Sequence, residues 1–187
     1  MTIGILRKNS IVDMLKEDHE NFRSLFSQFE NGDQVIKQRI ASEFMRLISY
    51  HDQIEKRLLY PLASEVSSEA EEIVLRSKEA HHVVNLLIIE LKSMPFGPHF
   101  NAKFSKLIDG VRDHMEEEEN ELFPLIEASD MDLRELGKQM VEMKEGLKAH
   151  GVFERVTSGG MGKLLTAAVV GGLGYWAYRA RRNSTSA

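Results

Sequence analysis

Two histidine–glutamate pairs in this sequence have a spacing suited to binding a metal from a helix. His51 is followed four residues later by Glu55, and His114 is followed four residues later by Glu118. Residues four apart lie one turn apart on the same helical face, so both side chains of a pair can reach one ion. A single pair of this kind is common, and the interpretation therefore depends on what surrounds the two pairs.

Both pairs belong to an internal repeat. A further histidine precedes each pair: His19 lies 32 residues before His51, and His81 lies 33 residues before His114. Apolar residues follow His19 and His81 at the same offsets, and an aromatic residue followed by proline ends both repeats. Agreement at so many positions indicates two equivalent helical hairpins, each carrying one lone histidine and one histidine–glutamate pair.

Four helical segments must position these residues. Clusters of Gly, Pro, Asn and Ser separate residues 10–29, 33–60, 69–93 and 99–127, and apolar residues recur at spacings of three and four in each segment. Short connections between long amphipathic helices predict an all-α fold, an antiparallel up-and-down four-helix bundle. A fifth helix is expected from about Leu133 to Phe153, packed beside the bundle.

The histidines lie in the apolar stripes, so folding would bring four imidazoles and two carboxylates into one core. Unpaired carboxylates there would be costly, and two divalent metals would remove that cost. The predicted metal ligands are His19, His51, Glu55, His81, His114 and Glu118. Bridging by both glutamates and by an oxo or hydroxo group leaves an exchangeable position on each ion for O2, peroxide or NO. Imidazole and carboxylate suit iron, with zinc and manganese as alternatives.

Two of these assignments have competing neighbours. His82 is adjacent to the third histidine, and Glu119 is adjacent to the second glutamate, so each could substitute for its neighbour. Most of the acidic run from Glu116 to Glu119 is expected to form a solvated face. His99 and His150 lie off the repeat and are expected at the surface or behind the ligands, and Tyr60 is expected to be an ordinary core residue.

Composition restricts the chemistry further. The 187 residues include no cysteine, which excludes disulfides, iron–sulfur clusters, thiolate zinc sites and cysteine nucleophiles. The N-terminal residues lack the apolar run of a secretory signal, so the main domain is expected to be cytoplasmic.

The C-terminal segment differs from the rest in charge. Residues 159–187 carry four basic and no acidic side chains; with a total net charge of −5, the remainder carries −9. An acidic body argues against a nucleic-acid partner. We therefore divide the chain into a bundle with its fifth helix, residues 1–157, and a short apolar glycine-rich helix with a basic end, residues 158–187. Residues 164–178 are uncharged and shorter than the roughly 20 residues of a usual membrane span. They are expected to attach to a membrane surface or to a second copy of the chain, with a true membrane span and a loosely structured tail as the alternatives.

The segments LKEDHENFRSLF, HDQIEKRLLYP, EAHHVVNLL and HMEEEENELFP resemble the ligand-bearing segments of the hemerythrin-like, His-His-Glu cation-binding domain family. The resemblance covers about residues 9–127 and implies a helical bundle with a non-haem di-iron centre held by the same six residues. Members of this family carry or sense O2, store or sense iron, or handle peroxide and NO.

The sequence departs from the oxygen-carrying hemerythrins in one respect. Those proteins have another histidine four residues after the third ligand, where this chain has Asn85. They also place the last carboxylate five residues after its histidine, which would select Glu119. The missing imidazole implies a more open site. The leading function is therefore O2 binding or sensing. One alternative is a di-iron peroxidase or NO-processing enzyme, and another is an iron-sensing or structural metal bundle. All three functions would use the same ligands.

Overall fold

The computed structural model describes residues 10–149, and throughout this range the protein has helices and no strands. Its long helices are α2 (Ile11–Asn31), α3 (Gln34–Ile54), α5 (Ser68–Ser93), α6 (Pro98–Glu117) and α8 (Leu133–Ala149). Shorter segments continue two of them: η1 (Glu55–Leu59) and α4 (Tyr60–Ala63) follow α3, and η2 (Glu118–Leu122) and α7 (Phe123–Glu127) follow α6. The predicted all-helical fold is confirmed for these residues. The expected end of the fifth helix at Phe153 and the tail, residues 158–187, lie outside them.

Local sequence determines where the first helices begin. The side chains of Ser10, Asp33 and Ser67 each accept a hydrogen bond from a backbone N–H in the first turn of α2, α3 and α5. Gly32 connects α2 to α3, and a Cβ atom there would lie 2.4 Å from Cγ2 of Ile36 and 2.7 Å from the carbonyl oxygen of Gln28. Only glycine fits this tight connection, which brings α3 back along α2.

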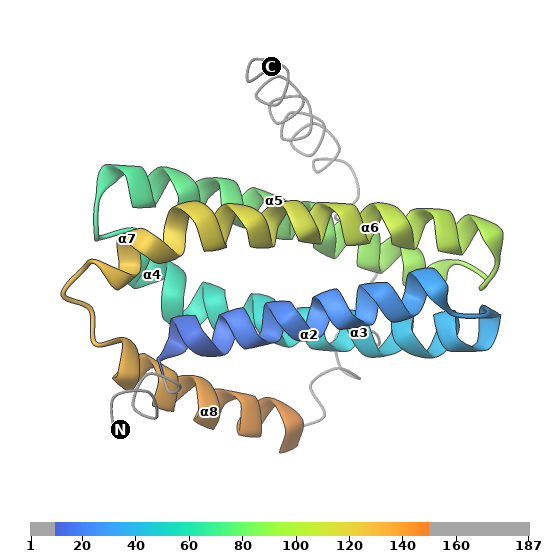
Figure 1. Ribbon diagram of the computed structural model, residues 1–187, viewed down its shortest axis with the longest axis horizontal. Coiled ribbons are helices and arrows are strands. Elements are labelled where there is room, and N and C mark those ends of the chain that lie inside the picture. Colours follow the sequence, from blue (N-terminus) through green and yellow to red (C-terminus); the bar gives the residue numbers. More distant parts are fainter. Residues whose placement is uncertain (1–9, 150–187) are drawn as a thin grey trace, which may run out of the picture.

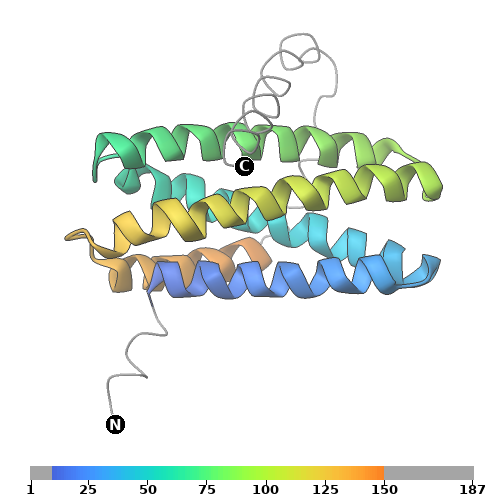
Figure 2. The same ribbon diagram turned by 45° about the horizontal axis from the view of Figure 1, so that its top comes forward.

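The four long helices α2, α3, α5 and α6 lie side by side and alternate in direction (Figures 1 and 2). Helix α2 packs against α3, and α5 packs against α6. Helix α8 packs on α2 and α3, on the side of the molecule away from α5 (Figure 1). The two hairpins recognised in the sequence are therefore the two halves of the bundle, and α8 packs mainly on the first.

A layer of polar side chains separates two apolar cores. One core contains Phe22, Phe44 and Phe104 and extends toward the α2–α3 connection, while the other contains Leu15, Tyr60 and Ile126 and includes residues of α8. The predicted ligands lie at the boundary: His19, for example, is between Leu15 and Phe22 in the sequence. The cores thus enclose the polar layer from both ends of the bundle.

Each half of the bundle contains a π-helical turn that begins at the glutamate of its histidine–glutamate pair. In η1 the N–H of Tyr60 donates to the carbonyl of Glu55, and in η2 the N–H of Phe123 donates to the carbonyl of Glu118. Proline follows both times, and its ring would clash with the carbonyl four residues earlier in a regular α-helix. The wider turn accommodates that proline. Helical periodicity predicts uninterrupted helices over residues 33–60 and 99–127 and does not reveal these turns, which are frequent at functional sites.

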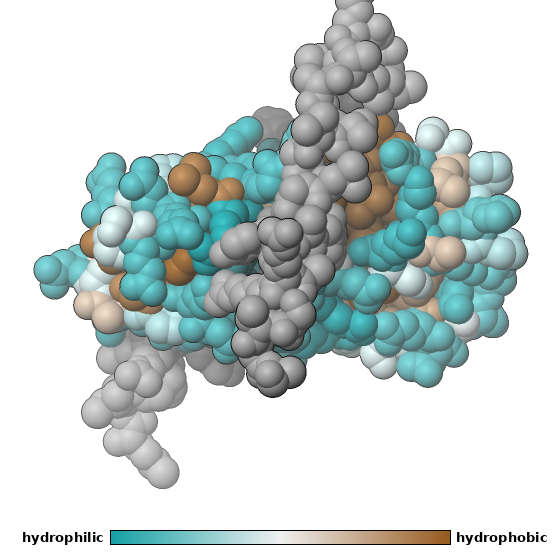
Figure 3. Space-filling model, turned by 90° about the horizontal axis from the view of Figure 1, so that it is seen from above, coloured by the Kyte–Doolittle hydropathy of each residue, from teal (hydrophilic) through white to brown (hydrophobic). Residues whose placement is uncertain are grey.

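The surface of the described part of the chain is mostly polar. The face seen in Figure 3 is largely hydrophilic, with apolar residues in separate groups. Exposed large apolar side chains such as Val35, Leu75 and Val141 lie on different helices. Among residues 10–149, no helix combines the length and the hydropathy that a bilayer crossing requires.

Candidate metal centre

The structure brings all six predicted ligands together in the middle of the bundle. Each is at most 3% exposed, and the six come from α2, α3, η1, α5, α6 and η2. The four imidazoles point their Nε2 atoms toward the two carboxylates. The competing His82 is exposed on α5, as is His99 at the start of α6, whereas His150 lies outside the described residues.

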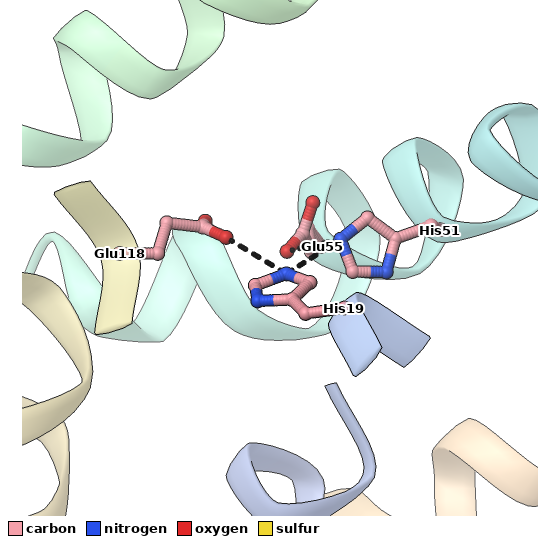
Figure 4. A group of neighbouring side chains, drawn as sticks. All are labelled: His19, His51, Glu55 and Glu118. Atoms are coloured by element: carbon pink, nitrogen blue, oxygen red, sulfur yellow. Dashed lines mark hydrogen bonds and ion pairs between the residues drawn. The ribbon is translucent and has the colours of Figure 1, made fainter. Parts of the chain in front are cut away.

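One group of candidate donors comprises His19, His51, Glu55 and Glu118, whose ligand atoms all lie within 4.8 Å of one another. The Nε2 atoms of His19 and His51 are 3.2 Å apart. Oε1 of Glu55 lies 3.0 Å from Nε2 of His51, and Oε2 of Glu118 lies 3.5 Å from Nε2 of His19. Figure 4 shows these side chains converging from three sides. Two nitrogens and two oxygens are thus placed to hold one ion.

A second group comprises Glu55, His81 and His114. Nε2 of His81 lies 2.7 Å from Nε2 of His114 and 3.3 Å from Oε2 of Glu55. Oε2 of Glu118 lies 3.5 Å from Nε2 of His114, the same distance as from His19. Glu55 therefore faces one group with each of its oxygens, and Glu118 faces both groups with a single oxygen. This arrangement suits two neighbouring ions that share both carboxylates.

The donor set fits metal ions for a second reason. Both oxygens of Glu55 and Oε2 of Glu118 are buried, and none of them accepts a hydrogen bond of normal geometry from residues 10–149. A buried carboxylate without such partners is costly unless a cation compensates it. Nitrogen and oxygen donors without sulfur suit iron, zinc or manganese.

The protein groups alone balance these charges unevenly. Burial opposes the charged form of His51, but the adjacent carboxylates of Glu55 and Asp18 outweigh it and raise its pKa to about 10. Burial also opposes ionisation of Glu55, yet His51 and the other imidazoles hold the pKa of Glu55 below its usual range. Burial and the charge of Glu55 raise the pKa of Glu118 well above its usual range. Burial and the neighbouring His81 lower the pKa of His114 well below its usual range. Without a cation, His51 and Glu55 are therefore charged and compensate each other, while Glu118 keeps its proton and His114 stays neutral.

Carboxylates also contact the outer nitrogen of three of the imidazoles. Nδ1 of His19 lies 2.7 Å from Oε1 of Glu119, Nδ1 of His81 contacts Asp52, and Nδ1 of His51 faces Asp18 at 3.6 Å. Such partners hold the ring in the tautomer that leaves Nε2 free to bind a metal. Sequence analysis missed Asp18 and Asp52, although each is adjacent in sequence to a predicted ligand.

These outer carboxylates have cationic or amide partners of their own. Arg23 donates a 2.7 Å hydrogen bond to Glu119, and Lys144 of α8 donates to both oxygens of Asp18 at 2.8 Å. Asn85 lies 3.4 Å from Asp52. Asn85 stands at the position where the oxygen-carrying hemerythrins have an additional histidine ligand. In this protein it contacts Asp52, the carboxylate beside Nδ1 of His81. Glu119 likewise lies behind His19.

The acidic run at the end of α6 and the start of η2 is not the solvated face that we expected. Glu116 is exposed, but Glu117 and Glu118 are buried, and Glu119 and Glu121 are partly buried. Nε of Arg76 donates to Glu117 at 2.7 Å, and Nη2 of Arg76 donates to Glu121 at 2.9 Å. Arg76 of α5 therefore holds the segment that carries Glu118.

Tyr60 has a polar role that sequence analysis also missed. It is fully buried, and its hydroxyl donates a hydrogen bond of 2.8 Å to Oε1 of Glu118. The hydroxyl oxygen of Tyr60 also lies 3.2 Å from Nε2 of His81. Burial and the charge of Glu118 raise the pKa of Tyr60 well above its usual range, so the phenol keeps its proton. At the equivalent repeat position Phe123 stacks on His19, so the two halves of the site differ in polarity.

A pocket of about 350 Å³ reaches the cluster from the side where α8 packs. Its lining includes His51, Asp18, Tyr50 and Lys144. Nδ1 of His51 faces the same Asp18 carboxylate that binds Lys144. One ligand of the cluster can therefore be approached from the outside.

Comparison with known proteins agrees with this geometry. The model of the hemerythrin HHE cation binding domain matches residues 10–126. A solved hemerythrin HHE cation binding domain-containing protein from Mycobacterium kansasii has a similar fold, with a TM-score of 0.66, 21% identity, and coverage of 81% of this chain and 94% of that one.

A curated relative is the DNA nickase of Nostoc sp. (strain PCC 7120). It is 25% identical over 119 residues, which make up 63% of this chain and 33% of the relative. This chain therefore spans about a third of the length of that protein, and the nickase name describes the Nostoc protein as a whole.

Proposed function

Because this chain belongs to the hemerythrin HHE cation-binding domain family, we propose that it holds two iron ions and binds O2 or a related small ligand at them. The observation that carries the proposal is the sharing of Glu55 between two groups of donors, each with two imidazoles. One ion would lie between His19 and His51, and the other between His81 and His114. Glu55 and Glu118 would bridge them. Bound iron would supply redox chemistry and an exchangeable coordination position.

The surrounding residues prepare the site for this task. Carboxylates of Glu119, Asp52 and Asp18 lie beside the outer nitrogens of three imidazoles and would favour the tautomer whose Nε2 lone pair is directed inward. The two apolar cores exclude bulk water from both ends of the polar layer. The pocket beside His51 is the approach that we propose for a small ligand.

One observation favours a second candidate function, the consumption of peroxide or NO. The Tyr60 hydroxyl is a buried proton donor 3.2 Å from Nε2 of His81, and Asn85 takes the place of an additional imidazole. An O–H donor beside an open coordination position favours reduction of a bound small molecule over its reversible storage. A bundle in which iron only stabilises the fold is the third possibility.

Metal analysis tests the central proposal. We expect about two iron atoms per chain in protein purified without chelators. Replacing His51 or His114 with Ala should reduce the stably bound iron to one ion or fewer per chain, because each substitution removes one of the two imidazoles proposed to hold one ion. His99→Ala is the matched control, since His99 is exposed, and it should keep its iron. One iron or none in the parent protein, or equal loss in the control, would show that the assignment is wrong.

Two further measurements separate the candidate functions. A reversible change in the optical spectrum between air and vacuum would support O2 binding, and steady-state consumption of H2O2 would support an enzyme. If the protein shows neither activity, and if removal of iron lowers its free energy of unfolding, the result would support a structural role for iron. We propose no nucleic-acid partner, given the acidic body of the chain. Nicking of supercoiled plasmid by the iron-loaded protein would contradict this.

A further inference from the structure

The two halves of the centre are equivalent at their inner nitrogens but differ behind one imidazole. His51 and His114 occupy the same position in the two repeats, and each has its Nε2 atom near a carboxylate, at 3.0 Å and 3.5 Å respectively. Nδ1 of His51 lies 3.6 Å from Oδ2 of Asp18, whereas the buried Nδ1 of His114 has no such ion pair among residues 10–149; neither nitrogen makes a hydrogen bond of normal geometry there. One of four similar rings therefore lacks an outer carboxylate.

The repeat explains this difference. Asp18 immediately precedes His19 on α2 and reaches across to His51 on α3. The residue that immediately precedes His81 on α5, beside the α6 helix of His114, is Ala80. Ala80 is buried at 3% exposure, so its methyl group stands where the first repeat has a carboxylate. Lys144 of α8 holds Asp18 in place, and α8 packs mainly on α2 and α3 of the first half of the bundle.

We propose that the two metal positions are unequal: the ion between His19 and His51 is held tightly, and the ion between His81 and His114 is the exchangeable one. Both imidazoles of the first position have an outer carboxylate, Glu119 or Asp18, while the second position has only Asp52, behind His81. An outer carboxylate makes the imidazole a stronger donor and fixes its tautomer, and losing one costs about 10- to 100-fold in metal affinity. This inference rests on the proposed two-metal function.

The test is the release of iron from the loaded, full-length protein to an excess of chelator. We expect two phases of equal amplitude, with rates that differ by about 10- to 100-fold. Asp18→Asn should accelerate the slow phase and bring the two rates together. Asp109→Asn, which changes an exposed carboxylate of α6, is the matched control and should leave both rates unchanged.

A gain-of-function variant tests the same idea in the opposite direction. Ala80→Asp places a carboxylate where Asp18 stands in the first repeat, and it should slow the fast phase without affecting the slow one. Circular dichroism would establish whether this buried substitution folds, and Asp18→Asn decides the question if it does not. Loading His114→Ala and His19→Ala at limiting iron assigns the positions, since the first variant should retain one slowly released ion and the second should not.

The outcomes separate this inference from the function on which it rests. Release of both ions in a single phase, or no change in either rate with Asp18→Asn, would overturn the inference while two ions per chain remain. Fewer than two ions in the loaded parent protein would instead overturn the proposed function.

Discussion

The hydroxyl of Tyr60 donates a hydrogen bond of 2.8 Å to Oε1 of Glu118, so a residue of the first repeat holds a carboxylate of the second. Tyr60 directly follows the π-helical turn of the first half, and Glu118 begins that of the second. The two interruptions of regular helix therefore meet at the centre. Glu118 is left with one oxygen, Oε2, directed at the histidines.

Tyr60→Phe should retain the iron but bind small ligands more weakly. The substitution preserves the ring that packs in the core and removes only the donor beside His81. Loss of one hydrogen bond of about 1.4 kcal/mol predicts a roughly tenfold increase in the dissociation constant for NO or azide. The measurement is optical titration of iron-loaded protein, with metal content determined for both forms. Loss of iron would instead mean that Tyr60 is needed to hold an ion, and Ser42→Ala, which removes an exposed hydroxyl, serves as a control.

Arg76→Met should destabilise the protein because it leaves the buried carboxylate of Glu117 without its cation. Removing one member of a buried ion pair costs about 3 kcal/mol, whereas replacing both members with apolar residues is often neutral. Urea denaturation should therefore show a large decrease in the free energy of unfolding for Arg76→Met. The double variant Arg76→Met/Glu117→Met should recover much of that decrease. Arg39→Met, which removes an exposed cation, should cost less than about 1 kcal/mol. A double variant no more stable than the single one would contradict this account of Arg76.

Glu119→Gln should lower stability in a pH-dependent way. The hydrogen bond from His19, and then Arg23, lowers the pKa of Glu119 to about 2 in the folded protein, from a usual value of 4.5. A lowered pKa contributes stability above the unfolded value, and that contribution disappears as pH falls through the folded value. The decrease in the free energy of unfolding caused by Glu119→Gln should therefore be largest above about pH 5 and diminish toward pH 2. Because Glu119 is partly exposed, we expect only about 1 kcal/mol. Urea titrations of chelator-treated protein at several pH values provide the measurement, and a loss independent of pH would contradict the ion pair.

Deleting residues 159–187 should leave the iron content unchanged and remove the attachment of the protein to anionic membrane surfaces. All six candidate ligands lie between His19 and Glu118, and the deleted segment contains neither acid nor histidine. Its apolar stretch and basic end should attach the protein to anionic liposomes, with about 1 kcal/mol from each basic residue, so the attachment should weaken in high salt. Flotation of full-length and truncated protein at two salt concentrations, with sizing of both, tests this expectation. Salt-resistant flotation would indicate a membrane span, and loss of iron would place the segment within the core.

The sequence by itself determined the helices, the repeat and the set of residues that converge. Helical periodicity places His19, His51, His81 and His114 on apolar stripes, and a stripe can only be buried by facing another stripe. Spacing of four along a helix then places Glu55 and Glu118 beside their histidines. These inferences need no knowledge of neighbouring helices, because each rests on one helix and its apolar face.

Only the tertiary structure decided which competing neighbour lies in the cluster and what lies behind the imidazoles. His81 and His82 are equally near in sequence, but the rotation of α5 in the bundle buries the first and exposes the second. The contacts of Asp18, Asp52 and Glu119 with imidazoles join different helices, and such pairings depend on the axial register of one helix against another. Helix periodicity also does not specify the π-helical turns that begin at Glu55 and Glu118. The difference between Asp18 and Ala80 was visible in the sequence, but its meaning depends on the packing that directs Asp18 toward His51.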